Sequence, residues 1–380
     1  MAIEDIILGS DEKNGQPLEQ KRKRLLNILD KSQEKVLNRI SGEIKFSDPI
    51  LFLNEKPFIY PDTINIIQGK SGVHKSRLVE IIMSVLVDPG KNSRLGFRAN
   101  QEIKIQGLYV DTERNQDDQL PYSFQQISKL TGINKNEIGK LILPISMIEV
   151  PRIDRLHALW FYLEEVRNTT EGHLVVVLDV ITDCVEDFNS AKKSMELIDM
   201  MNHMINEYDI TFISVIHENP GFGDKARGHL GTELNNKSSA TIQIKYLENQ
   251  DEILKVTLLK ARSVKSGTSF HLKYCDLQKT LIIPNESEIF EVQKNSKEKA
   301  KFKDLEPFLI NALEKGPIGR EDLLKELSLV LKCGTRILED RLKEILNSDF
   351  IITSSDGQKY TLDKFKDGRN VIYGLKALAD

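Results

Sequence analysis

The 380-residue sequence is poor in cysteine and tryptophan, with three and one respectively. Because Cys184, Cys275 and Cys333 lie far apart, neither a disulfide framework nor a cysteine metal site is predicted. The 53 lysines and arginines face 57 acidic residues, a net charge of −4, so no overall basic field indicates a nucleic-acid partner. There is no apolar run of membrane-spanning length and no leader-like N-terminus, so we expect a cytoplasmic protein with reduced thiols and no membrane partner.

The remaining composition is that of an ordinary globular protein, with 40% hydrophobic and 29% charged residues. A chain of this length is expected to form about two or three domains. Shifts in composition predict an N-terminal helical arm (1–43), a large α/β domain (44–285), a charged linker (286–302) and a small C-terminal domain (303–380).

The strongest motif follows a short apolar run at residues 64–68. A glycine-containing turn comes next, and apolar residues then recur at helical spacing from Leu78 onward. Strand, turn and helix in this order predict a phosphate-binding loop of the form G-x-x-x-x-G-K-[ST], whose backbone N–H groups wrap a polyphosphate. The residues of the loop are Gly69, Lys70, Ser71, Gly72, Val73, His74, Lys75, Ser76 and Arg77.

Lys75 and Ser76 carry the chemistry of this loop. Lys75 supplies a mobile positive charge to the outer phosphates of ATP, and the hydroxyl of Ser76 is placed to ligate Mg²⁺. His74 departs from the motif, which has glycine before the lysine. Histidine is enriched at positive φ, and Gly72 can take over part of the close approach to phosphate. The alternative is a chance glycine-containing turn before a helix.

Acidic residues follow two predicted strands. Glu113 comes shortly after the strand at 105–110, and Asp179 ends a continuous apolar strand at 173–178 that is typical of a buried parallel sheet. Open α/β sheets keep their chemistry at the carboxyl ends of the strands. We therefore expect Glu113 to orient the attacking water and Asp179 to hold Mg²⁺. For Glu113 a second role stays open, a carboxylate at a helix N-terminus.

A further polar residue, His217, ends the strand at 210–216, where it is placed to sense the γ-phosphate or position water. A strand-end histidine hydrogen-bonded to solvent is the alternative. Three more strands are predicted as an antiparallel meander, near 240–246, 252–260 and 268–274. Lys260 and Arg262 lie between the last two of them.

Taken in order, these segments resemble the RecA-like core of the DnaB, KaiC and plasmid RepA ATPases. The resemblance covers roughly residues 45–285, and the stretch 227–237 looks most like the RepA-type branch. The matching segments are the loop at 69–76, residues 109–113, the strand ending at Asp179, residues 214–217, Arg227-Gly228 and residues 260–262. It implies an α/β fold with a RecA-like, mostly parallel sheet flanked by helices and extended by a β-meander.

The resemblance also implies roles for single residues. Glu113 matches the catalytic glutamate of the family, Asp179 its Mg²⁺-associated aspartate and His217 its strand-end sensor. Lys260 and Arg262 match a pair that reaches the γ-phosphate bound to the neighbouring subunit. Such head-to-tail contacts close into a ring, which the family implies to be a hexamer.

The two ends of the chain are less specific. Residues 19–41 predict a helix with an apolar stripe and a basic run, either a solvated helix packed on the main domain or an arm that docks on a neighbouring subunit or nucleic acid. At 303–377, helices and a hairpin between 350–353 and 359–362 look like a winged helix, often a DNA reader. Residues 301–380 hold 14 basic and 14 acidic residues, 14 − 14 = 0, so DNA and protein contacts stay equally open.

The whole pattern predicts an ATP-hydrolysing, ring-forming motor or remodeller of single-stranded DNA, of the replicative-helicase type. Its cofactors are ATP and Mg²⁺, and the predicted setting is replication or mobilisation of DNA. Replication or mobilisation proteins are possible partners through the winged helix. The alternative is a nucleotide-sensing DNA-binding regulator, or an ATP-gated clamp, without helicase activity.

Overall fold

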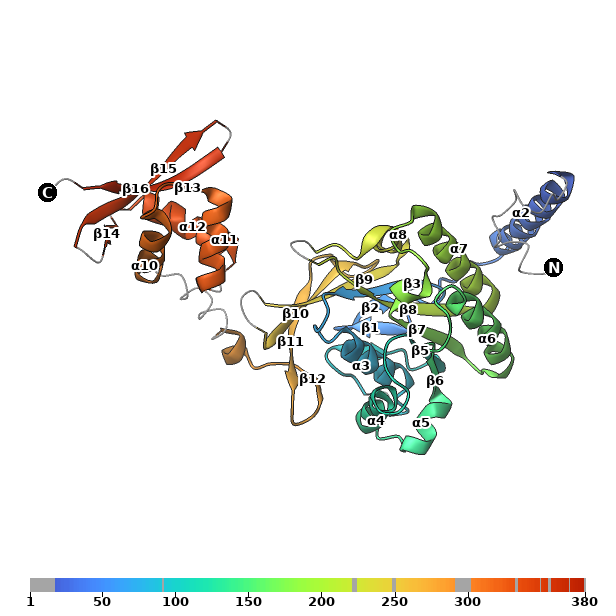
Figure 1. The fold of residues 1–380 in the computed structure, drawn as a ribbon. Coiled ribbons are helices and arrows are strands. Elements are labelled where there is room, and N and C mark those ends of the chain that lie inside the picture. Colours follow the sequence, from blue (N-terminus) through green and yellow to red (C-terminus); the bar gives the residue numbers. More distant parts are fainter. Residues whose placement is uncertain are drawn as a thin grey trace. The chain divides into compact units, whose positions relative to one another are not determined.

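The computed structural model describes residues 18–378 except 91, 221–223, 248–250, 291–301, 332–333, 349, 355–356 and 369. Residues 1–17 of the predicted arm and 291–301 of the predicted linker therefore lie outside the described residues. The chain divides into two compact units (Figure 1). The first contains residues up to 244 together with 257–269, and the second contains 245–256 together with the residues from 270 onward.

A nine-stranded sheet has the order β12-β11-β10-β9-β3-β8-β7-β5-β6. The pairings from β9 to β6 are all parallel, and β12, β11, β10 and β9 follow one another as an extension. The strands are β3 (Ile64–Gly69), β5 (Ile105–Asp111), β6 (Ile142–Ser146), β7 (His173–Asp179), β8 (Ile210–His217), β9 (Ala240–Tyr246), β10 (Ile253–Lys260), β11 (Ser269–Cys275) and β12 (Thr280–Ile282). The predicted α/β class, a mostly parallel sheet with a β extension, is confirmed.

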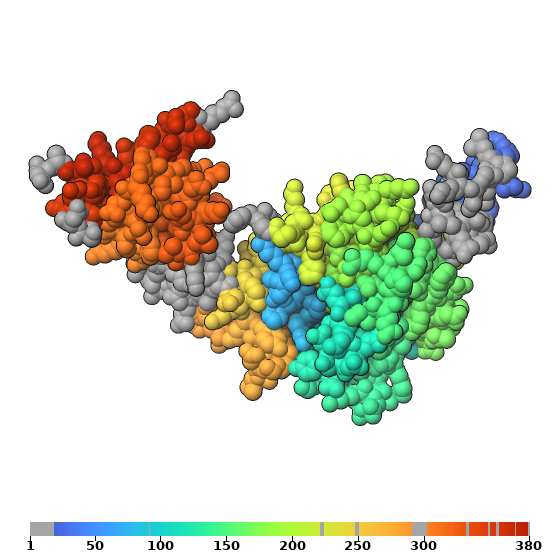
Figure 2. Space-filling model, in the orientation of Figure 1, coloured from blue at the N-terminus to red at the C-terminus, as the bar shows by residue number. Residues whose placement is uncertain are grey.

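Helices cover both faces of the parallel strands (Figure 1). One layer holds α3 (Lys75–Val87), α4 (Gln119–Thr131) and α5 (Lys135–Leu141), and the other holds α6 (Arg155–Thr169), α7 (Ala191–Tyr208) and α8 (Gly228–Lys237). Because both faces are covered, β8 is buried along almost its whole length, as its continuous apolar run predicts. In the space-filling view the residues of α4 to α6, coloured teal to green, form a continuous surface (Figure 2).

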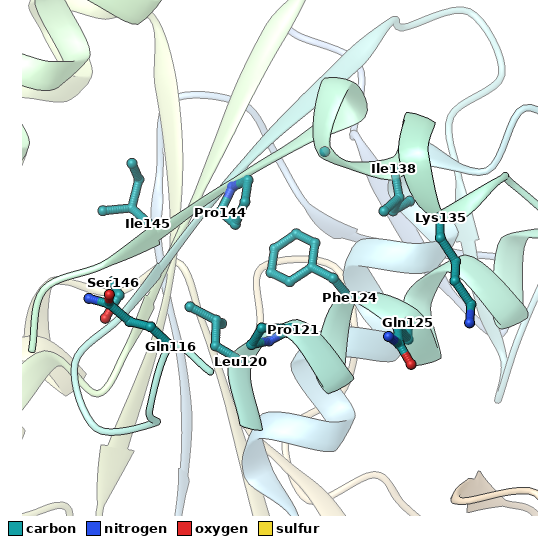
Figure 3. Close-up of a pocket in the computed structure, with 11 residues that line it drawn as sticks. Gln116, Leu120, Pro121, Phe124, Gln125, Lys135, Ile138, Pro144, Ile145 and Ser146 are labelled. Carbon is teal, nitrogen blue, oxygen red and sulfur yellow. The ribbon is translucent and has the colours of Figure 1, made fainter. Parts of the chain in front are cut away.

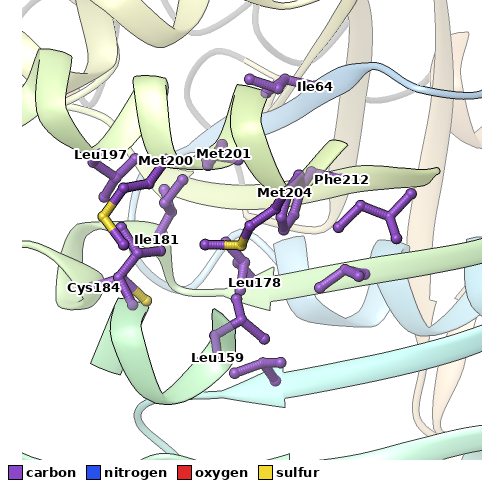
Figure 4. Close-up of a cluster of buried hydrophobic side chains, with 14 of the residues drawn as sticks. Ile64, Leu159, Leu178, Ile181, Cys184, Leu197, Met200, Met201, Met204 and Phe212 are labelled. Atoms are coloured by element: carbon purple, nitrogen blue, oxygen red, sulfur yellow. The ribbon is translucent and has the colours of Figure 1, made fainter. Parts of the chain in front are cut away.

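The main hydrophobic core lies between the sheet and the layer of α6 and α7. Met204 of α7 packs against Phe212 of β8 and Leu178 of β7 (Figure 4). Trp160, which the sequence places on an apolar helical stripe, is 1% exposed in the same core and stacks on His203. Met201 and Met204 of α7 are therefore core filling, as expected from their spacing, and so is Met200, whereas Met195 is exposed.

A small sheet combines two strands that precede the phosphate loop, where the sequence indicates only an extended lead-in at 44–63, with one strand that follows α3. Strands β1 (Leu51–Leu53), β2 (Lys56–Ile59) and β4 (Phe97–Ala99) pair in the order β2-β1-β4. Asn54 and Glu55 both have positive φ, 49° and 61°, which closes the tight turn between β1 and β2. Pro57 is tolerated because β2 is an edge strand.

In the second unit, residues 302–377 form a small domain of three helices packed on a four-stranded sheet of order β13-β16-β15-β14. Its elements are α10 (Phe302–Leu313), β13 (Ile318–Gly319), α11 (Arg320–Leu331), α12 (Thr335–Leu346), β14 (Ile352–Thr353), β15 (Lys359–Asp367) and β16 (Asn370–Ala377). The expected pairing of β14 with β15 is present, but β15 also pairs with β16 in a longer hairpin that the sequence analysis missed. Consecutive apolar residues at 371–373 obscure the alternation of that strand.

The N-terminal helix α2 (Leu18–Ile40) exposes its apolar stripe. Leu29 is 63% exposed and Leu37 is 56% exposed, so the interpretation of this stripe as a face packed on the main domain is wrong for these side chains. In the described part of the chain, no helix combines the length and apolar character needed to cross a bilayer.

Candidate nucleotide-binding site

The phosphate loop runs from the end of β3 at Gly69 to the start of α3 at Lys75. A Cβ atom on Gly69 would lie 2.3 Å from the carbonyl oxygen of Ile244, so only glycine fits this strand end. Within the loop, Gly72 and His74 both adopt positive φ, 80° and 60°. The turn therefore bends twice through left-handed backbone before the helix begins.

His74, the departure from the motif, takes the left-handed conformation that histidine tolerates better than most residues. Its carbonyl oxygen accepts the first hydrogen bond of α3, from the backbone N–H of Leu78 at 3.1 Å. Burial, and then the positive charge of Arg77, lower the pKa of the His74 imidazole. His74 is therefore neutral at pH 7 and contributes shape to the loop, and the positive charge comes from Lys75.

The Lys75 side chain is buried and faces back over the loop. Its Nζ donates to the carbonyl oxygen of Lys70 at 2.7 Å and lies 3.2 Å from Nδ1 of His217. Burial lowers the pKa of Lys75 from 10.5 to about 8, while Asp179, Glu113 and Glu218 oppose that shift. The nearby carboxylates offset the burial of the Lys75 ammonium group only in part. This group is suited to bind an anion, because the anion would replace the hydration that the ammonium group loses on burial.

Parallel pairing brings the predicted residues together at one edge of the sheet. Gly69 pairs with His217, and Asp111 pairs with Asp179. Nε2 of His217 lies 3.6 Å from Oε1 of Glu113, and this proximity holds the pKa of the Glu113 carboxyl below its ordinary value. Lys75, His217 and Glu113 thus form one continuous chain of contacts.

Asp179 has the properties of a metal-binding carboxylate. Burial raises the pKa of Asp179, while Arg114 opposes the shift, and Ser76 lies close enough for its hydroxyl to oppose it as well. Among the described residues, Oδ1 of Asp179 is buried without a hydrogen-bond partner. An unsatisfied carboxylate oxygen in a side chain near Ser76 fits Mg²⁺, which takes one or two protein oxygens and completes its shell with phosphates and water. Indeed, no group of three or more His, Cys, Asp or Glu in the described part of the chain could hold a metal by itself.

The sequence analysis missed a buried cluster around Arg114, the residue directly after Glu113. Its guanidinium group contacts Asp111, Glu80, Ser123, Tyr109 and Asp179. Although burial alone lowers the pKa of Arg114, Tyr109 and the three carboxylates raise it well above its usual range. The available signal was Glu80, a charged residue within the apolar run Leu78-Val79-Glu80-Ile81-Ile82.

A second missed group is Glu218, which is 5% exposed beside His217. Its Oε1 accepts hydrogen bonds from Gln68 of β3 at 2.9 Å and from Gln243 of β9 at 2.6 Å. These contacts tie the end of β8 to β3, which carries the phosphate loop, and to β9, the next strand in the sheet. The position of His217 is therefore fixed by its neighbour.

Lys260 and Arg262 do not join this site within the chain. Nζ of Lys260 donates to the carbonyl oxygens of Asn235 at 2.9 Å and Asn236 at 3.0 Å, at the C-terminal end of α8. Arg262 is exposed. In the part of the chain that the structure describes, neither residue has a hydrogen bond or ion pair with Lys75, Glu113 or His217.

A separate cavity of about 580 Å³ lies between α4, α5 and β6. Phe124, Ile138 and Pro144 point toward one another within it (Figure 3). The eleven residues that line it include none of the predicted nucleotide-binding or catalytic residues. The predicted nucleotide-binding residues therefore lie at the strand edge and not in this cavity.

No protein-family model matches this chain, and no curated protein matches its sequence. Among solved structures, that of the RadB recombinase is similar with a TM-score of 0.40 and 10% identity, over 59% of this chain and 92% of that one. A second solved structure, an isolated ATPase domain, gives a TM-score of 0.45 and 10% identity, over 68% of this chain and 99% of that domain. At this level of similarity, the function has to be argued from the site itself.

The pKa of Lys75 makes a testable prediction about pH. Since the free protein loses the Lys75 proton above about pH 8, triphosphate affinity is expected to fall as pH rises past that value. The loss approaches about tenfold per pH unit, the limit for one required proton. Titration of a fluorescent ATP analogue from pH 7 to 9.5 measures it. The Lys75→Arg variant, whose side chain stays charged over this range, should give a flat profile. An equally steep fall in that variant would rule out Lys75 as the titrating group.

Proposed function

We propose that the chain is a Mg²⁺-dependent ATPase with a RecA-like core. One observation supports this above all: Lys75, His217 and Glu113 are in consecutive contact at the carboxyl ends of parallel strands, beside a phosphate loop. A buried cation and a half-exposed carboxylate match the phosphate-binding and water-orienting groups of phosphoryl transfer to water, and the strand-end imidazole contacts both of them. Asp179 and Ser76 lie on the same edge and provide the metal ligands.

Each residue has a distinct role in this proposal. Lys75 leaves the carbonyl of Lys70 and binds the outer phosphates, and the loop N–H groups hold the remaining ones. Glu113, whose low pKa keeps it ionised at pH 7, accepts a hydrogen bond from the attacking water and orients it. His217 contacts both groups, so it can report the presence of the γ-phosphate to Glu113. Mg²⁺, when bound, would neutralise charge on the phosphates between Ser76 and Asp179.

We further propose that Lys260 and Arg262 act on the nucleotide of a neighbouring subunit. Arg262 is exposed, and Lys260 contacts the end of α8 in its own subunit, so neither residue reaches the phosphate loop of the same chain. An arginine supplied across an interface stabilises the charge of the transferring phosphoryl group. Head-to-tail assembly, closing into a ring that we propose to be a hexamer, places one such residue at each site.

The proposed substrate of the motor is single-stranded DNA, with replication or mobilisation of DNA as the setting. The small domain at residues 302–377 is proposed to be a winged helix, and its charges favour a protein contact. On α12, Lys343 lies 3.5 Å from Asp340, and Arg341 pairs with Glu344. Glu339 of the same helix pairs with Arg320. Because these cations are already compensated, α12 offers little net charge to a phosphate backbone.

One observation favours the alternative, a nucleotide-sensing regulator or ATP-gated clamp. Oε1 of Glu113 contacts His217, and a movement away from that contact would free this oxygen to orient a water molecule. If that movement requires a partner, the isolated protein binds ATP and turns it over only slowly. The two functions differ in turnover and share the same binding site.

The Glu113→Gln variant tests the catalytic assignment. The amide keeps the shape of the side chain but cannot act as a base, so ATP binding should stay within about threefold of wild type while turnover falls by at least about 100-fold. Lys75→Ala should instead lose binding, because it removes the charge that receives the phosphates. Nucleotide titration and phosphate release are measured on both variants. Wild-type turnover in Glu113→Gln would show that another group orients the water.

The Arg262→Ala variant tests action across an interface. This variant should fold and bind ATP but lose turnover by on the order of 10³-fold, the usual effect of removing such an arginine. Mixing it with Glu113→Gln should restore activity, because mixed assemblies contain interfaces in which both residues are intact. Phosphate release is followed as the ratio of the two variants changes, with mixing verified by labelled subunits. No recovery in verified mixed assemblies would mean that Arg262 acts within its own chain.

A further inference from the structure

The Arg114 guanidinium group has every one of its donors engaged. An arginine side chain carries five N–H donors, one on Nε and two on each terminal nitrogen. Here Nε donates to Asp111 at 2.6 Å. Nη1 donates to Glu80 at 2.8 Å and to Ser123 at 2.5 Å. Nη2 donates to the hydroxyl of Tyr109 at 2.9 Å and to Asp179 at 3.0 Å.

These contacts join four elements around the strand edge. Glu80 belongs to α3, the helix that starts at the phosphate loop, Asp111 and Tyr109 to β5, and Asp179 to β7. Ser123 belongs to α4. Glu80, Asp111 and Asp179 are each no more than 3% exposed. A guanidinium group whose five donors all meet buried acceptors fixes geometry, because any rearrangement would leave a buried charge unpaired.

The cluster distinguishes the two oxygens of Asp179. Oδ2 accepts from Arg114 and also from the hydroxyl of Tyr109 at 2.8 Å. Oδ1 is the oxygen without a hydrogen-bond partner among the described residues. The Asp179 carboxylate is therefore held through Oδ2, which leaves Oδ1 for a metal ion.

Through Asp111, Arg114 also holds the turn that carries Glu113. Oδ1 of Asp111 accepts from the backbone N–H groups of Glu113 at 3.1 Å and Arg114 at 2.6 Å. Its Oδ2 is the acceptor for Nε of Arg114. The Glu113 backbone is thus anchored to a carboxylate that Arg114 itself fixes.

We propose that Arg114 is a positioning residue that orients the metal-side oxygen of Asp179 and aligns it with the turn bearing Glu113. This inference rests on the proposed ATPase function and assigns to it a residue whose guanidinium donors all meet protein groups. Partners that orient metal ligands typically contribute about 10–100-fold to metal affinity or activity. A lysine at this position would keep the charge but could not reproduce the planar fork.

The test compares nucleotide affinity with and without Mg²⁺ in the full chain. For Arg114→Lys, the Kd of a fluorescent, non-hydrolysable ATP analogue in EDTA should stay within about threefold of wild type, because the phosphate loop is untouched. At saturating Mg²⁺ the Kd of Arg114→Lys should be about tenfold higher than that of wild type. Most of the affinity that Mg²⁺ adds in wild type is then lost in the variant. The kcat for ATP should fall by a similar factor or more.

Arg94→Lys is the matched control. Arg94 is as buried as Arg114, each with 18% of its side chain exposed, and pairs with the buried Asp88 at 2.8 Å, at the opposite end of α3. The Arg94→Lys variant shows how replacing a buried arginine in general affects nucleotide affinity. It should leave the effect of Mg²⁺ on that affinity unchanged. Equal losses of the Mg²⁺ effect in both variants would overturn the proposal, as would a wild-type Mg²⁺ effect in folded Arg114→Lys.

Tyr109→Phe provides a second test that removes only one hydroxyl. It deletes one of the two donors to Oδ2 of Asp179, so we expect a change in the same direction, on the order of threefold. If Arg114→Lys fails to fold by circular dichroism, an unchanged Mg²⁺ effect in Tyr109→Phe overturns the proposal. Wild-type protein that binds no nucleotide would contradict the proposed ATPase function itself, a result distinct from either variant's behaviour.

Discussion

The hydrogen-bonded ladder of parallel strands is the constraint on which the site depends. It aligns the ends of β3, β8, β7 and β5, so that residues far apart in sequence emerge at one edge. A shift of one residue in the register would turn His217 or Asp179 to the other face of the sheet. Buried polar groups reinforce the register: Arg114 ties β5 to β7, and Glu218 ties β8 to β3 and β9.

The local sequence pattern was sufficient to predict where the site residues that follow strands would lie. The phosphate loop, Glu113, Asp179 and His217 each come at or just after the end of an apolar run, and the structure brings them to one edge. The left-handed backbone at His74 also follows from residue type, since histidine tolerates positive φ. The α/β class needed no more than the order of the strands and helices.

Contacts between distant segments could not be predicted in the same way. Tyr109 and Asp179 are separated by 70 positions, and nothing in the sequence near Arg114 indicates which carboxylates it will meet. Strand β4 pairs with β1 across more than 40 positions, which turned an expected lead-in into a sheet. The proposed role of Arg262 concerns a second subunit, so contacts within one chain do not include it.

We propose that this strand edge hydrolyses ATP and that the energy is used on single-stranded DNA. Phosphate release by the wild-type chain with Mg²⁺, measured with and without single-stranded DNA, tests both parts of this proposal. Our expectation is Mg²⁺-dependent turnover that single-stranded DNA increases. Tight ATP binding with no turnover under either condition would contradict it and would favour a nucleotide-gated clamp.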